Sequence, residues 1–479
     1  MTLFDRIAAI AAVDPSRMAL CGPEQGLSYA ELHSQVNALA QQLLNEKIAR
    51  LALLLDNGLE WALVDLACML AHIVIVPIPM FFSAQQQEWL LESSGVDALI
   101  GPARDGWNTT KSFHLPLQRR VPINPVVLPS NTAKITYTSG TTGRPKGVCL
   151  SVAQMMMVSE SIAQRVAPVN IQHHLALLPL ATLLENITGI YVPLLAGVTS
   201  RLPPLQVIGM TGSSQFSPSI LSQALQRWQP HSVVLVPELL RLLVRLCAMQ
   251  PTLSSHFRFI AVGGGKVAPG MLEQAQRVGL PVYEGYGLSE CGSVVAMNGP
   301  GRVRSGSAGK PLPHCQVTIA DDQEILVNGT SMLGYIGEPN VTDTIATGDL
   351  GHIDADGFLY ITGRKKNVMI TAFGRNVSPE WIEAEAQLCP AIARVVLFGD
   401  NMPVNVAVVQ IVPGYEPQLD EQIALLNNRI PDYAQIHHYI IAQFSRENGL
   451  LTDNGRPKRE HIFNRYHAQI NQLCSGKDQ

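Results

Sequence analysis

The chain has 479 residues, more than one ordinary domain needs, so we expect two or more folded units. A hydrophobic fraction of 47% and a charged fraction of 15% exclude a disordered protein, and a net charge of −4 without a basic stripe gives no electrostatic basis for nucleic-acid binding. The eight cysteines stand singly, which argues against a zinc site or a disulfide framework. This cysteine usage is typical of a reducing compartment, so we expect a cytoplasmic protein.

The N-terminal residues lack the basic head and long apolar run of a secretory signal. The most hydrophobic stretch, residues 61–82, contains Asp65, His72, Pro77 and Pro79, which a membrane span tolerates poorly. We therefore predict a buried helix followed by a buried strand there, and no transmembrane segment. Peripheral contact with a membrane stays compatible with the sequence.

Helix-like and strand-like segments then alternate. Residues 27–46 have the apolar spacing of a helix, and Ser28 followed by Glu31 is the pattern of a capping box. Aliphatic runs at 51–56, 232–237 and 257–265 predict buried strands. Short aliphatic strands separated by helices indicate an α/β fold with parallel-rich sheets covered by helices.

The pattern changes after residue 300. Residues 300–330 are rich in glycine with short alternating runs, which predicts a small antiparallel β region. The sequence DADG at 354–357 predicts a tight turn between two short strands.

After Arg364 we predict a strand at 367–372, a helix from Ser378 and a strand at 394–400, which together form a small α+β domain. The basic, polar GRKK segment is the natural boundary. We therefore divide the chain into a large N-terminal domain, 1–363, and a C-terminal domain, 364–479.

The segment TYTSGTTGRPKGV, residues 136–148, combines the features of a phosphate-binding loop. Hydroxyl groups can donate hydrogen bonds, Lys146 supplies positive charge, and Gly140, Gly143 and Gly147 let the backbone approach an anion and take positive φ. A flexible surface turn is the alternative. The spacing does not fit the G-x-x-x-x-G-K-[ST] pattern of other nucleotide-binding loops.

Other polar segments are less specific when each is taken alone. In YEGYGLSE, residues 283–290, an aromatic ring could stack on a base and Glu290 could hold a divalent cation near phosphates, or the segment is an ordinary strand end. In TGDLG, residues 347–351, Asp349 could accept both hydroxyls of a ribose, and Arg364 could contact ribose or phosphate. The basic segment 451–460 is, by itself, most simply a solvated loop.

In order along the chain, these segments resemble the ANL superfamily of adenylate-forming enzymes, which includes acyl-CoA synthetases and the adenylation domains that load carrier proteins. YTSGTTGRPKG is similar to the phosphate loop of that family, GYGLSE to its Y-G-x-T/S-E motif, GSAGKPLP to its glycine-proline motif, and TGDLG to its ribose-binding motif. GRKKNVMITAFGRNVSPEWIE is similar to its hinge and the start of its lid domain. The resemblance covers essentially the whole chain.

The resemblance implies a two-step reaction. A carboxylate attacks the α-phosphate of ATP to give acyl-AMP and pyrophosphate, and a thiol then attacks the mixed anhydride and releases AMP. It also implies that ATP, Mg²⁺ and coenzyme A, or the phosphopantetheine of a carrier protein, take part. The C-terminal domain would be a mobile lid with its hinge near residues 364–367.

Residue roles follow from the same resemblance. Glu290 and Thr141 would hold Mg²⁺, Asp349 and Arg364 the ribose, and Lys366 would mark the hinge. The nucleotide-binding set implied for the phosphate loop is Thr138, Ser139, Gly140, Thr141, Thr142, Gly143 and Lys146. The set implied for the adenine side and the lid loop is Gly264, Gly265, Glu284, Gly285, Tyr286, Gly287, Ser289 and Gly374.

The sequence departs from the family in two places. Thr182 stands where the family often has a histidine or an aromatic residue, so the acyl entrance is expected to differ. The late motif T-x-x-G-K reads TDNGR, so Arg456 occupies the position of the catalytic lysine, and the nearest lysine is Lys458. Both stay candidates, with Lys146 and Glu290, for the catalytic set.

The acid that is activated is less well defined. Residues 175–210 and 237–249 are mostly aliphatic, which suits a fatty acyl chain, although most of these residues are expected to be core. The lid start is most similar to long-chain acyl synthetases. We expect a fatty acid–CoA ligase, with transfer to an acyl-carrier protein or a non-catalytic nucleotide-binding member as the alternatives.

Overall fold

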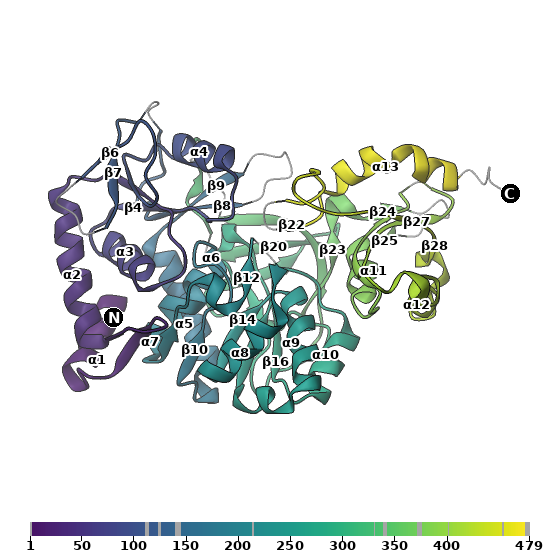
Figure 1. The fold of residues 1–479 in the computed structure, drawn as a ribbon, viewed down its shortest axis with the longest axis horizontal. Coiled ribbons are helices and arrows are strands. Elements are labelled where there is room, and N and C mark those ends of the chain that lie inside the picture. Colours follow the sequence, from purple (N-terminus) through teal and green to yellow (C-terminus); the bar gives the residue numbers. More distant parts are fainter. Residues whose placement is uncertain are drawn as a thin grey trace.

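The computed structural model describes residues 2–110, 115–122, 126–138, 145–212, 215–329, 331–338, 343–370, 376–400, 402–452 and 455–474. Figure 1 shows a large N-terminal part and a smaller C-terminal part that lies next to strand β23 (Leu359–Arg364). Both parts mix helices and sheets, which confirms the predicted α/β fold class.

The largest sheet positions most of the site described below. Its strands follow the spatial order β18 (Lys310–Pro311), β17 (Ala296–Met297), β16 (Val282–Tyr286), β15 (Phe259–Val262), β14 (Ser232–Leu235), β10 (His173–Leu175), β11 (Thr199–Arg201), β1 (Met18–Cys21) and β2 (Gly26–Ser28). Neighbours from β16 to β1 pair in parallel, and both edges are antiparallel. The aliphatic runs that predicted buried strands are β14 and β15 of this sheet.

A second sheet carries the strands around the phosphate-loop motif. Its spatial order is β21 (Gly334–Tyr335), β9 (Lys146–Leu150), β8 (Lys134–Thr138), β4 (Val74–Pro77), β3 (Arg50–Leu53), β5 (Ala98–Ile100), β7 (Leu117–Arg119) and β6 (Asn108–Thr109). The pairs from β8 to β5 are parallel. Strand β3 corresponds to the strand predicted at 51–56, but it ends earlier than expected, at Leu53.

Helices flank these sheets. They are α1 (Leu3–Val13), α2 (Tyr29–Asn45), α3 (Leu59–Leu70), α4 (Ala84–Ser93), α5 (Val152–Val166), α6 (Leu183–Asn186), α7 (Val192–Ala196), α8 (Pro218–Trp228), α9 (Pro237–Met249) and α10 (Pro269–Arg277). The predicted capping box of α2 is present, because the Ser28 side chain accepts from the Glu31 N–H and the Glu31 carboxylate accepts from the Ser28 N–H. Helix α3 and strand β4 confirm the helix and strand predicted within residues 61–82. Across the described ranges, no helix combines the length and hydropathy that crossing a bilayer requires.

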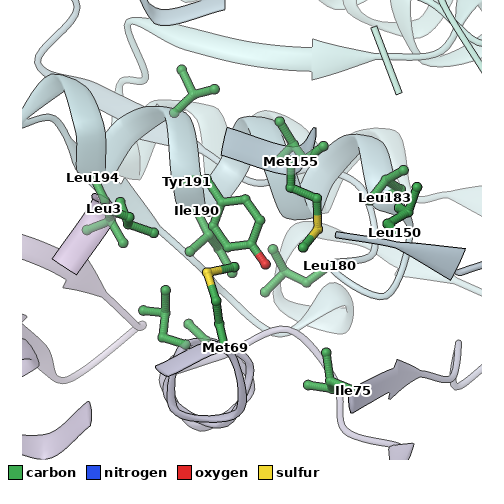
Figure 2. Packing of buried hydrophobic residues seen from close by; sticks show 14 of the residues in the cluster. Leu3, Met69, Ile75, Leu150, Met155, Leu180, Leu183, Ile190, Tyr191 and Leu194 are labelled. Atoms are coloured by element: carbon green, nitrogen blue, oxygen red, sulfur yellow. The ribbon is translucent and has the colours of Figure 1, made fainter. Parts of the chain in front are cut away.

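A charged cluster lies fully inside the N-terminal core, where α3, β8 and the helical segment 183–196 meet. Lys134 Nζ is 2.6 Å from Asp65 Oδ1 and 2.8 Å from the Tyr191 hydroxyl, and it also donates to Asn186. The second oxygen of Asp65 accepts from Tyr191 at 2.6 Å and from Asn186 at 3.1 Å. Figure 2 shows the Tyr191 ring between its own helix and Met69 of α3, among aliphatic side chains. Burial lowers the pKa of Lys134, and the neighbouring Asp65 opposes this shift.

The small β region predicted after residue 300 is an antiparallel sheet of β19 (Cys315–Ile319), β20 (Glu324–Gly329), β22 (Thr344–Ile353) and β23. The predicted turn connects β22 to β23. Asp354 Oδ1 accepts from the N–H groups of Asp356 and Phe358, and Gly357 has a φ of +82° that favours glycine.

The C-terminal part has its own elements. They are β24 (Met369–Ile370), β25 (Asn376–Val377), α11 (Pro379–Ala386), β26 (Ile392–Phe398), β27 (Asn405–Ile411), α12 (Leu419–Asn427), β28 (Ile436–Ile441) and α13 (Arg459–Cys474). The helix that begins after Ser378 and the strand at 394–400 are present, whereas the strand predicted at 367–372 is described only as the short β24. Buried aliphatic clusters lie on both faces of the sheet formed by β26, β27 and β28. The division at residues 363 and 364 and the mobility of this part stay predictions.

Helix α9 holds the C-terminal part through one side chain. Arg241 donates from Nη1 to the carbonyl of Ile392 and from Nη2 to the carbonyl of Cys389, both at 3.0 Å. A planar guanidinium binds two carbonyl groups with little loss of freedom, so this contact helps to orient the two parts, together with the hydrogen bond from Arg446 Nη1 to the Phe81 carbonyl.

Candidate active site

A cavity of about 1500 Å³ opens where the carboxyl ends of β10, β14, β15 and β16 meet the C-terminal part. The carboxyl edge of a parallel sheet is the usual ligand-binding position in α/β folds. From this end, the cavity continues between the sheet and the helices α5 and α7. It therefore joins a polar end to a long, mainly apolar interior.

The phosphate-loop strands reach the polar end. Thr138 and Lys146 are paired across β8 and β9, and both line the cavity. Lys146 Nζ lies 4.9 Å from the centre of the Tyr335 ring, and the Tyr335 hydroxyl donates to Glu290 Oε1 at 3.0 Å. Predicted residues that lie outside the described ranges are Ser139, Gly140, Thr141, Thr142, Gly143 and Gly374.

Tyr335 was not predicted, because the LGYIG segment has no feature that separates it from an ordinary strand. Burial and the neighbouring Glu290 raise the pKa of Tyr335 above its usual range, so the hydroxyl keeps its proton. Tyr335 thus connects the loop lysine to the predicted metal-binding carboxylate.

The prediction for Gly147 was wrong. Its φ is not positive, and Gly147 lies within strand β9. An added Cβ would meet Ile336 Cδ1 at 2.4 Å, so a larger residue at this position would require the Ile336 side chain, in the segment after β21, to shift.

Asp349, Arg364 and Tyr286 form the second cluster. Asp349 and Arg364 are paired across β22 and β23, and Arg364 Nε lies 2.6 Å from Asp349 Oδ1. The Tyr286 hydroxyl donates to Asp349 Oδ2 at 2.7 Å. Burial raises the pKa of Asp349, while Arg364 and Tyr286 act in the opposite direction. Tyr286 and Arg364 line the cavity, and they cover Asp349, which does not.

The glycines after β15 and β16 also line the polar end, as does Ser289. Gly264 has a φ of +78°, and a Cβ at Gly287 would lie 1.8 Å from the Ser293 carbonyl oxygen. Both positions therefore need glycine. The lining residues from the predicted set are Gly264, Gly265, Gly285, Tyr286, Gly287, Ser289 and Glu290.

Glu284 does not line the cavity. Its Oε2 accepts from the Gly306 N–H at 3.2 Å, and burial raises its pKa to about 7, with Gly306 and Lys266 opposing the shift. The structure places this carboxylate with the loop before β18 and not with the nucleotide-facing residues.

The C-terminal loop distinguishes the two candidate cations. Thr452 closes the loop, because its N–H donates to the Arg456 carbonyl at 2.7 Å and its Oγ1 accepts from the Arg456 N–H at 3.0 Å. Arg456 Nη2 then donates to the Gly264 carbonyl at 2.7 Å, and the side chain lines the cavity. Lys458 donates its backbone N–H to Leu450 and does not line the cavity. Loss of hydration lowers the pKa of Arg456, while nearby Glu238 raises it.

Two neighbouring lysines after β23, Lys365 and Lys366, differ in their contacts. Lys365 Nζ lies 2.6 Å from Asp322 Oδ2 and 2.8 Å from Glu324 Oε2. Lys366, the predicted hinge, is exposed and does not line the cavity. Loss of hydration, followed by repulsion from Arg364, lowers the pKa of Lys366.

The interior of the cavity is mainly apolar. From the aliphatic segments 175–210 and 237–249, a minority of side chains reach the cavity, and many of the others belong to the hydrophobic core. Thr182 lines the cavity and donates to the Pro179 carbonyl at 2.7 Å. Sequence patterns missed Phe259 and Tyr283, whose rings stack at 4.6 Å on this wall, because an aromatic residue in a strand has no distinct signal.

Comparison with known proteins agrees with this geometry. The family model described as "AMP-binding enzyme" matches residues 7–338, and the model described as "AMP-binding enzyme C-terminal domain" matches residues 366–478. The chain is 29% identical over 468 residues to the long-chain-fatty-acid–CoA ligase FadD15 of Mycobacterium bovis, covering 80% of this chain and 77% of the relative. It is 28% identical over 486 residues to the indoleacetate–CoA ligase of Aromatoleum aromaticum, covering 90% and 92%.

The fold is also similar to a solved structure, the o-succinylbenzoate–CoA synthetase of Bacillus subtilis in complex with its acyl-adenylate intermediate. The TM-score is 0.76 at 22% sequence identity, and the match covers 95% of this chain and 97% of the other. These findings confirm the predicted family. The chain therefore belongs to the AMP-binding enzymes, the ANL superfamily of adenylate-forming acid–thiol ligases.

Proposed function

We propose that this protein activates a fatty acid with ATP and transfers the acyl group to coenzyme A. The observation that carries the proposal is one cavity that joins three polar clusters, around Glu290, Asp349 and Arg456, to an apolar interior. The similarity to a long-chain-fatty-acid–CoA ligase supports the choice of acid.

In the first step, a carboxylate oxygen of the acid attacks the α-phosphorus of ATP, and the bond to pyrophosphate breaks. Arg456 projects over the glycine wall, where its charge would neutralise the acid carboxylate and the α-phosphate as they approach. Lys146, at the other side of the polar end, would hold the departing pyrophosphate. These roles are positioning and charge neutralisation, which this reaction mainly requires.

Magnesium fits the Glu290 position. Its Oε1 accepts the described hydrogen bond from Tyr335, and a carboxylate has further lone pairs that a hard cation prefers. Mg²⁺ bound there would neutralise phosphate charge. Asp349 orients Arg364 and Tyr286, which line the cavity where the ribose would lie.

In the second step, the thiol sulfur attacks the acyl carbon, the bond to the phosphate oxygen breaks, and AMP leaves. A carrier-protein phosphopantetheine carries the same thiol as coenzyme A. A competition between coenzyme A and a set of carrier proteins, scored as thioester formed, identifies the acceptor.

Pyrophosphate exchange with a panel of fatty, aryl and amino acids tests the first step. We expect exchange with fatty acids, AMP as the product, and a fall of about 100-fold in Arg456→Ala, since hydrogen bonds to charged groups contribute about 1.5–3 kcal/mol. Lys458→Ala is the matched control and should retain most exchange. No exchange with any acid, while ATP still binds, would contradict the proposal, and ADP as the product would indicate a kinase instead.

A further inference from the structure

A buried hydrogen-bonded pair, His174 and Ser232, lines the cavity away from its polar end. His174 of β10, Ser232 of β14 and Phe259 of β15 are register partners on adjacent parallel strands. His174 Nδ1 lies 3.0 Å from Ser232 Oγ, and His174 Nε2 lies 3.3 Å from Glu185 Oε1. Both His174 and Ser232 line the cavity, although they are only 4% and 5% exposed.

Toward the nucleotide end the surroundings of this pair are apolar, whereas the lining residues that precede His174, Gln172 and His173, are polar. Val234 and Ala261 form the next lining positions towards the nucleotide end, and the stacked rings of Phe259 and Tyr283 lie beside them. A polar group buried in such a place costs free energy unless it has a hydrogen-bond partner. The Ser232 hydroxyl and the His174 imidazole thus form the first polar position beyond the apolar lining of Val234 and Ala261.

The fold makes room for this arrangement. Glu185 is fully buried behind His174, and a Cβ at Gly189 would lie 3.0 Å from Glu185 Oε1. Gly189 belongs to a π-helical turn, Ile187–Tyr191, a local irregularity that is frequent at functional sites. Burial raises the pKa of Glu185, with His174 opposing the shift.

The hydrogen-bonding capacity of Ser232 is not used up by the protein. A hydroxyl can donate once and accept twice, and in the described part of the chain Ser232 Oγ contacts only His174. Its remaining capacity is available to a molecule in the cavity.

The depth of the pair follows from strand geometry. Ser232 precedes Val236 by four residues, and Val236 lies at the level of Gly264 and Arg456. At roughly 3.3 Å per residue, the pair is about 13 Å below the position where the acid would be activated.

We propose that Ser232, positioned by His174, binds a hydroxyl group on the acyl chain about 13 Å from the activated carboxylate, so that the preferred substrate is a hydroxylated fatty acid. This inference rests on the proposed function and makes it more specific. Ser232 is the specificity-determining residue, and His174 and Glu185 are positioning residues.

The test compares ω-hydroxy fatty acids with their unsubstituted parents of equal chain length, as kcat/KM for AMP formation. We expect the wild-type protein to prefer the hydroxylated acid of matching length by about 10-fold, the effect of one good hydrogen bond. Ser232→Ala should bring this ratio close to one. Ser222→Ala is the matched control, because Ser222 is equally buried but bonds to Gln250 away from the cavity, and it should keep the wild-type ratio.

Each outcome decides the inference. A ratio near one in the wild-type protein, or an unchanged ratio in Ser232→Ala, overturns it while leaving the proposed function intact. A merely structural role of Ser232 would lower both rates and leave the ratio unchanged. If no acid is turned over, the proposed function fails, and calorimetric titration of the same acid pairs into wild type and Ser232→Ala decides the inference by binding.

Discussion

Replacing Lys134 by methionine should lower the free energy of unfolding by about 3–5 kcal/mol, because it leaves the carboxylate of Asp65 buried without its cation. Two unit charges 2.6 Å apart attract by roughly 6 kcal/mol at an effective dielectric constant of about 20. The desolvation of the two ions, several kcal/mol each, offsets that attraction in the intact protein. Removing the cation alone loses the attraction and keeps the cost of the buried anion.

The second substitution is the matched control. Asp65→Asn in the Lys134→Met background removes the charge but keeps an oxygen that can accept from Tyr191 or Asn186. We expect this double variant to recover about half of the loss, which leaves it about 1.5–2.5 kcal/mol less stable than the wild type, since neutral hydrogen bonds contribute about 1 kcal/mol each.

Equilibrium unfolding in urea measures these differences. Tryptophan fluorescence follows unfolding, and one of the five tryptophans, Trp61, lies beside the cluster, with Lys134 Nζ 5.9 Å from the centre of its ring. A loss below about 1 kcal/mol in Lys134→Met, or a further loss on adding Asp65→Asn, would refute the electrostatic reasoning.

Three further predictions concern pH, packing and the C-terminal part. The pKa of Glu284 is raised from its ordinary value to about 7, so the folded protein binds more protons than the unfolded chain between pH 4.5 and 7. The stabilisation by protonated Glu284 is therefore lost as pH rises through that window. In urea unfolding, the free energy of unfolding of Glu284→Gln relative to the wild type should then rise by up to about 3 kcal/mol across the window. Gly309→Ala should cost about 3 kcal/mol or more in the same assay, because Gly309 has a φ of +85° and its Cβ would meet backbone at 1.9 Å; a loss under about 1 kcal/mol would contradict this. Arg241→Ala should speed proteolysis after residue 364 about 10-fold while leaving the N-terminal fragment resistant, since two hydrogen bonds to Cys389 and Ile392 are lost, and an unchanged rate would argue that other contacts hold the C-terminal part.

Much of the fold was predictable from local sequence patterns. The Ser28 capping box, the aliphatic strands β14 and β15 and the turn at 354–357 depend on residues close in sequence, so their structure was predictable. The strand predicted from residue 367 begins only at Met369, because hydrophobic alternation does not determine where strand pairing begins, and residues 371–372 lie outside the described ranges.

For the candidate site, the sequence-based predictions came from motifs and stay predictions. Thr138, Lys146 and Glu290 were placed by resemblance, and the structure brings Lys146 and Glu290 to the two sides of Tyr335. The sequence left Arg456 and Lys458 open, and our proposal of Arg456 depends on the geometry of the loop, which Thr452 closes.

The acyl side depends on contacts between distant strands. His174 and Ser232 are 58 residues apart and meet only because β10 pairs with β14. The single-sequence pattern around each residue is that of an ordinary buried strand, so neither signalled a role.

The ion pairs that hold the chain to the N-terminal part end at Lys365, just after β23. Arg364 forms an ion pair with Asp349, and Lys365 forms ion pairs with Asp322 and Glu324. These three carboxylates belong to the N-terminal part. In the described part of the chain, Lys366 is the first residue after them without an ion pair. A rotation of the C-terminal part that begins at Lys366 would leave the Asp349–Arg364 pair undisturbed. The ribose contacts would then be insulated from that rotation, so a nucleotide could stay in place while the groups around its phosphate end are exchanged.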